Sequence, residues 1–351
     1  MKLMVGIEDF TSESDIEELV RAGTDEFFTG IIPKEWAGIY GYQVSLNRRE
    51  WSPNQFHSFE KLRVIADTIH SLGKKIAVAF NAPDYYAGQL PYIKKYFHKL
   101  KELRIDALII ADLSLLFMLK EWELEFDIYM SGTAGAYNSR AVKHYAHLGV
   151  KRILFPRDMT LDEMKNVIEN TSHSGIEYEA FMMGERCPFT ESYCRTTHGF
   201  ASILFCHHLW GKSPYLRLQF GFYKIYEKEG NKNIVDYISR PSIDLIKKWN
   251  YNSAQYKGWA SGGLAMTLNF FDMAVEECGL CAIPVLAAIG VHSLKIVGRS
   301  RPVKTKLVRV RLVKNILDNI KLGSAYAKEL RNNPDLCALG YKCYYPEARN
   351  R

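Results

Sequence analysis

The first 180 residues alternate between two kinds of segment. An amphipathic stretch with apolar residues at positions i, i+3 and i+4 ends, often at a glycine, and a short apolar run follows a few residues later. The first stretch shows the expected cap, stripe and final glycine at Ser12, Ile16, Leu19, Val20 and Gly23. This order of helix and buried strand is typical of βα units that build a parallel sheet.

Eight apolar runs are predicted to be strands. They are residues 2–7, 26–32, 75–81, 107–112, 127–131, 152–156, 177–184 and 293–298. Most are nearly continuous in apolar residues, as strands covered on both faces should be. A closed barrel accommodates eight such units, whereas an open doubly wound sheet would carry a Gly-rich phosphate turn after its first strand, and none follows here. We therefore predict an α/β fold, a (β/α)8 TIM-type barrel.

The alternation stops between Cys187 and Ile289, in a stretch rich in aromatic residues. This stretch is too long for an ordinary βα loop. We predict a barrel over residues 1–320 that includes a long cysteine-bearing insertion at 185–290, between strands 7 and 8. Residues 321–351 are predicted to form a C-terminal tail. The insertion is expected on the C-terminal face, where barrels build their sites.

Composition and charge narrow the class of protein. A hydrophobic fraction of 47% suffices for a large core. No apolar run approaches the roughly 18 residues of a membrane span, and Glu8 and Asp9 interrupt the first run, so we expect a soluble, cytoplasmic protein. The net charge of +7 favours an anionic partner or a solvated basic helix face. A basic run comprises Arg299, Arg301, Lys304, Lys306, Arg309, Arg311 and Lys314.

The seven cysteines lie in three small groups in the second half of the chain. The groups are Cys187, Cys194 and Cys206; Cys278 and Cys281; and Cys337 and Cys343. In a reducing compartment such grouping indicates metal binding or catalysis before disulfides, although buried structural thiols remain an alternative. The spacing matches neither a ferredoxin run nor paired zinc knuckles.

Several motifs occur in a distinctive order along the chain. Met183 and Gly184 precede two cysteines seven residues apart, and Cys281 is followed by Gly290-Val291 and Gly298-Arg299. Residues 109–113 and 149–158 add two earlier βα motifs. Together they resemble the peptidase U32 family, from about residue 3 to about residue 315.

The resemblance implies a 4Fe-4S cluster held by four cysteines. By position these are Cys187, Cys194, Cys206 and Cys281. Cys206 matches the family spacing least well; if it is not the fourth ligand, Cys278 or His207 would take its place. Cys337 and Cys343 have no counterpart in the family core, so we expect them to cover the bottom of the barrel or to bind a separate metal ion rather than the cluster.

Family members are implicated in oxygen-independent hydroxylation of ubiquinone precursors or of bases in ribosomal and transfer RNA. The resemblance therefore implies a cluster-dependent enzyme that hydroxylates an anionic or aromatic small molecule. RNA base hydroxylation is an alternative, as is a non-catalytic iron-sulfur sensor or one subunit of a heteromeric pair within the family. Peptidase activity is disfavoured because neither H-E-x-x-H nor G-x-S-x-G occurs.

Polar residues stand at the predicted carboxyl ends of four strands, where barrel enzymes bind substrate. We predict catalytic roles for Asp112 and Arg157, and substrate contacts for Asn81 and Arg299. Arg299 would anchor an anionic group, because loops after strands 7 and 8 bind phosphate in many barrels. The alternatives are that Asp112 caps a helix and that the arginines pair with carboxylates.

Overall fold

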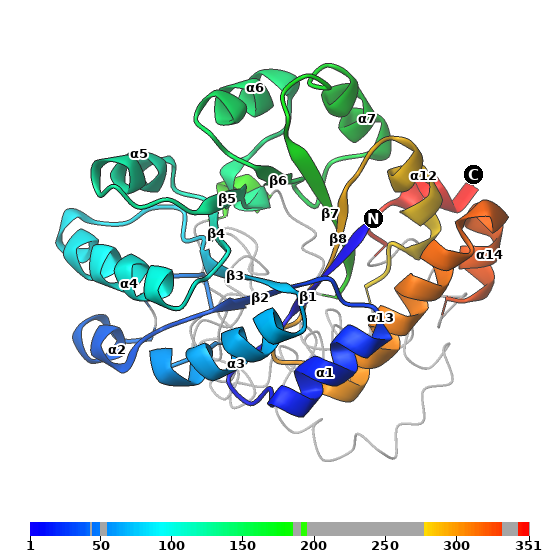
Figure 1. Cartoon of the computed structure of the whole chain (residues 1–351). Helices are drawn as coiled ribbons and strands as arrows, with labels where there is room; N and C mark the ends of the chain where they lie inside the picture. The colour runs from blue at the N-terminus through cyan, green and yellow to red at the C-terminus, as the bar shows by residue number, and fades with distance from the viewer. Residues whose placement is uncertain (43, 50–54, 185–190, 195–276, 332–342, 351) are drawn as a thin grey trace, which may run out of the picture. The chain divides into compact units, whose positions relative to one another are not determined.

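In the computed structural model the chain forms a closed barrel of parallel strands in sequence order, as predicted (Figure 1). The structure describes residues 1–42, 44–49, 55–184, 191–194, 277–331 and 343–350. Lys2 lies opposite Ser293, which closes the barrel between its first and last strands. The strands are β1 (Lys2–Gly6), β2 (Glu26–Gly30), β3 (Lys75–Phe80), β4 (Ala107–Ile110), β5 (Asp127–Met130), β6 (Arg152–Leu154), β7 (Glu177–Met183) and β8 (Ser293–Ile296).

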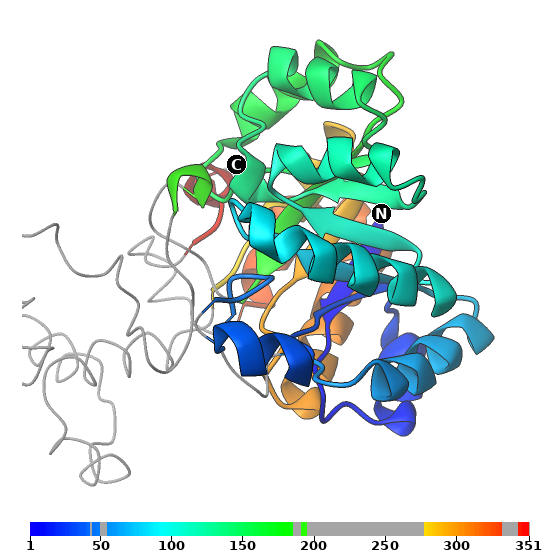
Figure 2. The same ribbon diagram turned by 90° about the vertical axis from the view of Figure 1, so that its left-hand side faces the viewer.

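Helices surround the strands (Figures 1 and 2). They are α1 (Glu13–Ala22), α2 (Lys34–Tyr40), α3 (Phe59–Ser71), α4 (Leu90–Glu102), α5 (Leu113–Glu121), α6 (Ser139–His147), α7 (Leu161–Glu169), α12 (Ile283–Ala288), α13 (Val303–Asp318) and α14 (Gly323–Glu329). The predicted caps are confirmed for α1, where the Ser12 side chain accepts from the Asp15 N–H and Gly23 adopts a left-handed φ of 117°. Of the helices described, none is long and apolar enough to cross a membrane.

Side chains alternate along each strand between the barrel interior and the helices. Outward residues such as Val5, Phe27 and Ile76 are buried against the helical layer. The strand register places Leu154 opposite Glu179 and Phe181 opposite Lys295, so charged side chains enter the interior beside apolar ones. The interior is therefore charged toward the amino ends of the strands and mixed toward their carboxyl ends.

The described end of the tail, residues 343–350, packs against the carboxyl end of β7. The Tyr345 hydroxyl donates to the Phe181 carbonyl at 2.7 Å, and Cys343 pairs through a β-bridge with Cys278, which itself pairs with Met183. The expectation that the tail covers the bottom of the barrel is wrong for these residues, because Met183 is the last residue of its strand. Most of the predicted insertion, including 195–276, lies outside the described residues.

Candidate functional site

A cavity of about 80 Å³ lies on the barrel axis at the carboxyl ends of the strands. Such a volume accommodates several water molecules or one small anionic group. Its apolar wall consists of Phe28, Ala79, Ile109, Leu154, Phe181 and Val297. Its polar lining includes Asn47, Arg48, Arg49, Asn81, Ser131, Arg157, Glu191, Lys295 and Arg299. The cavity is thus lined by five cations and, among the described residues, by a single carboxylate.

Three of the four predicted strand-end residues line this cavity together: Asn81, Arg157 and Arg299. The Asn81 amide donates to the Ser131 hydroxyl at 3.3 Å, and its buried Oδ1 accepts no hydrogen bond from the described residues. That oxygen is available to a donor on a bound molecule, because buried polar atoms are rarely left without a partner.

Asp112 is placed differently from the other three. It is not part of the cavity lining, and its two carboxylate oxygens accept main-chain N–H groups of Ser114 at 2.8 Å and Tyr85 at 3.1 Å. It therefore caps α5 and braces the loop after β3, which is the capping role considered from the sequence.

The Arg299 side chain lines the cavity, and its guanidinium packs closely against neighbouring residues at the barrel mouth. Its Nη2 donates to Asn47 Oδ1 at 3.0 Å. A Cβ atom added to Gly30 would lie 2.1 Å from Arg299 Nη1, so only glycine leaves room for the guanidinium there. Arg299 itself is 7% exposed. The sequence predicted its involvement, whereas the requirement for Gly30 arises from packing across strands.

Two further cations support the main chain around Arg299. Lys306 Nζ donates to the Arg299 carbonyl at 2.7 Å, and Arg309 Nη1 donates to the Val297 carbonyl at 3.1 Å. Both side chains lie on α13 and are buried. Burial lowers the pKa of Lys306 to about 8, although the Glu8 charge opposes this shift. The basic run is therefore not one exposed cationic edge, because these two residues and Arg299 point inward.

Arg157 is held between a carboxylate and an aromatic ring. Its Nη1 forms an ion pair with Glu191 Oε1, and the guanidinium carbon lies 3.6 Å from the centre of the Phe181 ring. Gly132 makes room for Glu191, since a Cβ there would lie 2.7 Å from its Oε2. Glu191 comes eight residues after Met183, the last residue of β7. No hydrophobic periodicity in the sequence therefore indicated that Glu191 contributes to the site.

Arg48 also lines the cavity and was missed by sequence reasoning. Its Nη1 donates to the Thr133 hydroxyl at 2.7 Å, and its Nε has no hydrogen-bond partner among the described residues. Its φ of 62° is unusual for a residue other than glycine. Strained backbone of this kind is concentrated at functional sites, which is consistent with a role for Arg48 in binding. It lies in a loop without periodic signal.

Lys295 forms the charged floor of the cavity. Its Nζ donates to Glu179 Oε1 at 3.0 Å and to Met4 Sδ at 3.4 Å, and it lies 4.2 Å from the centre of the Phe28 ring. Burial lowers the pKa of Lys295, while the neighbouring Glu179 carboxylate opposes this shift. The sequence could have indicated Lys295 as an interior residue, because the neighbouring strand β7 carries Glu179, which can pair with it.

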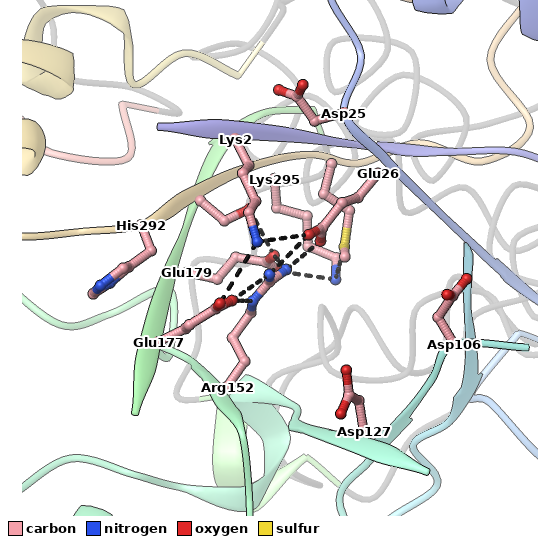
Figure 3. Close-up of polar contacts among 12 residues, drawn as sticks. Lys2, Asp25, Glu26, Asp106, Asp127, Arg152, Glu177, Glu179, His292 and Lys295 are labelled. Atoms are coloured by element: carbon pink, nitrogen blue, oxygen red, sulfur yellow. Dashed lines mark hydrogen bonds and ion pairs between the residues drawn. The ribbon is translucent and has the colours of Figure 1, made fainter. Parts of the chain in front are cut away.

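Below Lys295, Arg152 joins three carboxylates inside the barrel (Figure 3). Its guanidinium contacts Glu26 at 3.0 Å, Glu177 at 2.9 Å and Glu179 at 3.1 Å, and Arg152 is 1% exposed. Burial would lower the pKa of Arg152, but hydrogen bonding to Glu26 and the surrounding carboxylate charge raise it overall. This network fills the amino-terminal half of the interior and supports the cavity floor through Glu179.

The network makes stability depend on pH. Burial would raise the pKa values of Glu26 and Glu177, but hydrogen bonds and charge from Arg152 lower both below 4.5. Each lowered pKa stabilises the fold above pH 4.5 and ceases to do so as the pH falls through the folded-state value. The difference in unfolding free energy between wild type and Glu26→Gln, from urea titrations at pH 7 to 3, should therefore shrink with acidification. A difference that stays constant would contradict this.

The predicted cluster ligands are only partly within the described residues. Cys281 is 6% exposed and Cys194 is half-buried, whereas Cys187, Cys206 and the substitute His207 lie outside the described residues. Within the described ranges, no three histidine, cysteine or carboxylate side chains converge on a single metal ion. A cluster requires less convergence, because each cysteine binds a different iron.

Comparison with known proteins identifies relatives of this chain. The model of peptidase family U32 matches residues 13–202, more than half of the chain. Two curated relatives named tRNA hydroxylation protein P, from Haemophilus influenzae and Escherichia coli, are each 29% identical over 45% of this chain. These matches span 33% of each relative, about a third of its length.

A solved structure described as the U32 peptidase Mk0906 is 14% identical, with a TM-score of 0.40 over 61% of this chain and 82% of that chain. The family match includes the motifs at residues 109–113, 149–158 and 183–194 and ends before Cys281. The chain belongs to the peptidase U32 family.

Proposed function

We propose that this protein is an iron-sulfur enzyme that hydroxylates a small molecule bound through an anionic group in the barrel-mouth cavity. The observation that carries the proposal is the charge of the cavity lining, in which Arg48, Arg157, Lys295 and Arg299 face one small space. Their side chains are largely buried, so their charges are screened less than surface charges. A carboxylate or phosphate fits this environment.

The lining also suggests how the bound molecule is oriented. Arginine presents a planar fork of N–H donors that matches carboxylate and phosphate oxygens. Arg299 and Arg48 would bind the anionic group, while Phe28 and Phe181 would contact an apolar or aromatic body. No histidine or cysteine is among the described lining residues, which disfavours a cysteine or serine peptidase mechanism in this cavity.

The family resemblance implies a 4Fe-4S cluster, and the residues present fit it. Cys187, Cys194 and Cys281 would bind it, with Cys206 as the fourth ligand predicted from the sequence. Cys281 is a buried thiol that follows Cys278 and Gly279, which contact the carboxyl end of β7, and thiolates are the ligands such clusters require. When bound, the cluster supplies one-electron redox chemistry. The described residues would bind, orient and desolvate the substrate.

A transfer RNA base is the second candidate substrate. The names of the relatives favour it, since both are tRNA hydroxylation proteins. An RNA phosphate would satisfy the cavity cations as well as a free acid would. The exposed cations remaining on α13, such as Lys304 and Arg311, provide fewer phosphate contacts than the full basic run would.

Cells lacking the gene, grown without oxygen, test the proposal through paired metabolite and RNA-nucleoside profiling. We expect one unhydroxylated acid to accumulate, and restoration by the wild-type gene but not by Cys281→Ala. Loss of a hydroxylated nucleoside instead would favour RNA, and steep salt dependence of tRNA binding would support that outcome. If neither profile changes, the proposal of an enzyme is rejected.

A further inference from the structure

The tail brings a cysteine to the segment that carries Cys281. Cys278 forms β-bridges with Met183 on one side and with Cys343 on the other. The Tyr344 N–H donates to the Cys278 carbonyl at 3.0 Å, and the Gly279 N–H donates to the Met182 carbonyl at 2.8 Å. Bridged residues on adjacent strands lie roughly 5 Å apart, so Cys343 is an immediate neighbour of the C-x2-C segment.

This position of the tail is fixed by several independent contacts. The Tyr344 hydroxyl donates to the Gly184 carbonyl, and the Tyr345 hydroxyl donates to the Phe181 carbonyl at 2.7 Å. Glu347 Oε1 accepts the Leu161 N–H at 2.7 Å, at the start of α7. A Cβ at Gly279 would lie 3.0 Å from the Tyr345 ring. Such packing places Cys343 reproducibly rather than at the end of a loose tail.

The thiols of Cys281 and Cys343 are buried to a similar degree. Cys343 is 8% exposed and Cys281 is 6% exposed, whereas Cys278 between them is more accessible. The Tyr344 contact is to Gly184, the residue directly after the end of β7 and three residues before Cys187 in the sequence. Cys343 bridges Cys278, and Cys281 follows Cys278 by three residues, so both buried thiols belong to segments that lie at the carboxyl end of β7.

From this geometry we infer that Cys343 is a cluster ligand alongside Cys281, in the place that the sequence assigned to Cys206. The inference rests on the proposed iron-sulfur function. It also revises the expectation that the tail cysteines stay apart from the cluster, which was based on their absence from the family core. Cys206 matched the family spacing least well, whereas Cys343 is supported by contacts. The cluster would then fasten the tail to the barrel.

Cluster content of the full chain, reconstituted anaerobically with iron and sulfide, tests the inference. Wild type should hold about four irons per chain. Cys281→Ala and Cys343→Ala should each lose at least half of this iron, while Cys206→Ala and the matched tail variant Cys337→Ala should retain it. Added 2-mercaptoethanol should restore iron to Cys343→Ala, because a small thiol can replace a missing ligand but not a missing packing contact.

The outcomes separate the two proposals. Absence of iron from wild type would remove the iron-sulfur function itself. Iron in wild type, with full retention and an unchanged electron paramagnetic resonance spectrum in Cys343→Ala, would overturn only the role of Cys343. Melting of the iron-free proteins checks folding. Iron loss by a Cys343→Ala protein that melts well below wild type and is not rescued by thiol would also count against ligation.

Discussion

Arg152→Met is expected to lower the free energy of unfolding by about 3–5 kcal/mol. The substitution removes the cation shared by Glu26, Glu177 and Glu179 and leaves their carboxylates inside the barrel. Lys2 and Lys295 still contact members of the network, but Lys2 is 46% exposed and Lys295 pairs with Glu179 alone. Buried carboxylates without compensation are costly because they have been taken out of water. Urea unfolding at pH 7 measures the change.

Lys151→Met provides the matched control. Lys151 precedes Arg152 and forms an ion pair with Asp127, but both side chains are at least one third exposed. Exposed pairs contribute about 0–1 kcal/mol, so this variant should unfold close to wild type. Equal destabilisation by the two substitutions would show that burial of the Arg152 network has no special effect. Acidification should narrow the gap between Arg152→Met and wild type, since protonation neutralises the abandoned carboxylates.

Arg299→Gln is expected to weaken binding of inorganic phosphate by about 10- to 100-fold, the effect of removing a charged hydrogen bond. The Arg299 guanidinium reaches the cavity from the loop after β8. Lys306 donates to the main-chain carbonyl of Arg299, and Arg309 donates to the carbonyl of Val297 in the same loop. Glutamine keeps a polar side chain of smaller reach but removes the charge. Calorimetric titration with phosphate at constant ionic strength measures the affinity.

Arg311→Gln loses the same charge from an exposed position on α13 and should bind phosphate nearly as wild type does. Gly30→Ala should reproduce the defect without touching any cation, because the new methyl group occupies the space of the Arg299 guanidinium. Gly38→Ala is its control, since a Cβ there meets no neighbour within 4 Å. Equal affinities for Arg299→Gln and Arg311→Gln would rule out a specific role for the cavity cation.

The fold was predictable because its signals are local. Most strands are short apolar runs, and the helices between them are delimited by caps such as Ser12 and Gly23 of α1. Neither signal depends on distant residues. The interior network was less accessible, although the alternation of Glu177 and Glu179 in β7 indicates a charged inner face. Identifying Arg152 as the partner of these glutamates requires knowing that β6 pairs with β7.

The site was predictable where strand ends define it. Asn81, Arg157 and Arg299 come within three residues of the ends of their strands, and they meet because parallel strands end on one face. Arg48 and Glu191 come from loops whose course depends on tertiary contacts, so no spacing indicated them. The basic run misled for the same reason: Lys306 and Arg309 lie on a helix face that only packing reveals as buried.

The pairing of β1 with β8 also has a consequence for biogenesis. About 290 residues separate Lys2 from its partner Ser293, so this contact has a very high sequence separation. At a synthesis rate of roughly 5–20 residues per second, β1 waits about 15–60 s on the ribosome before its second neighbour exists. Throughout that interval the edge of β1 that later pairs with β8 is unpaired and can recruit a foreign strand. Nascent chains are therefore expected to depend on chaperones until the last strand emerges.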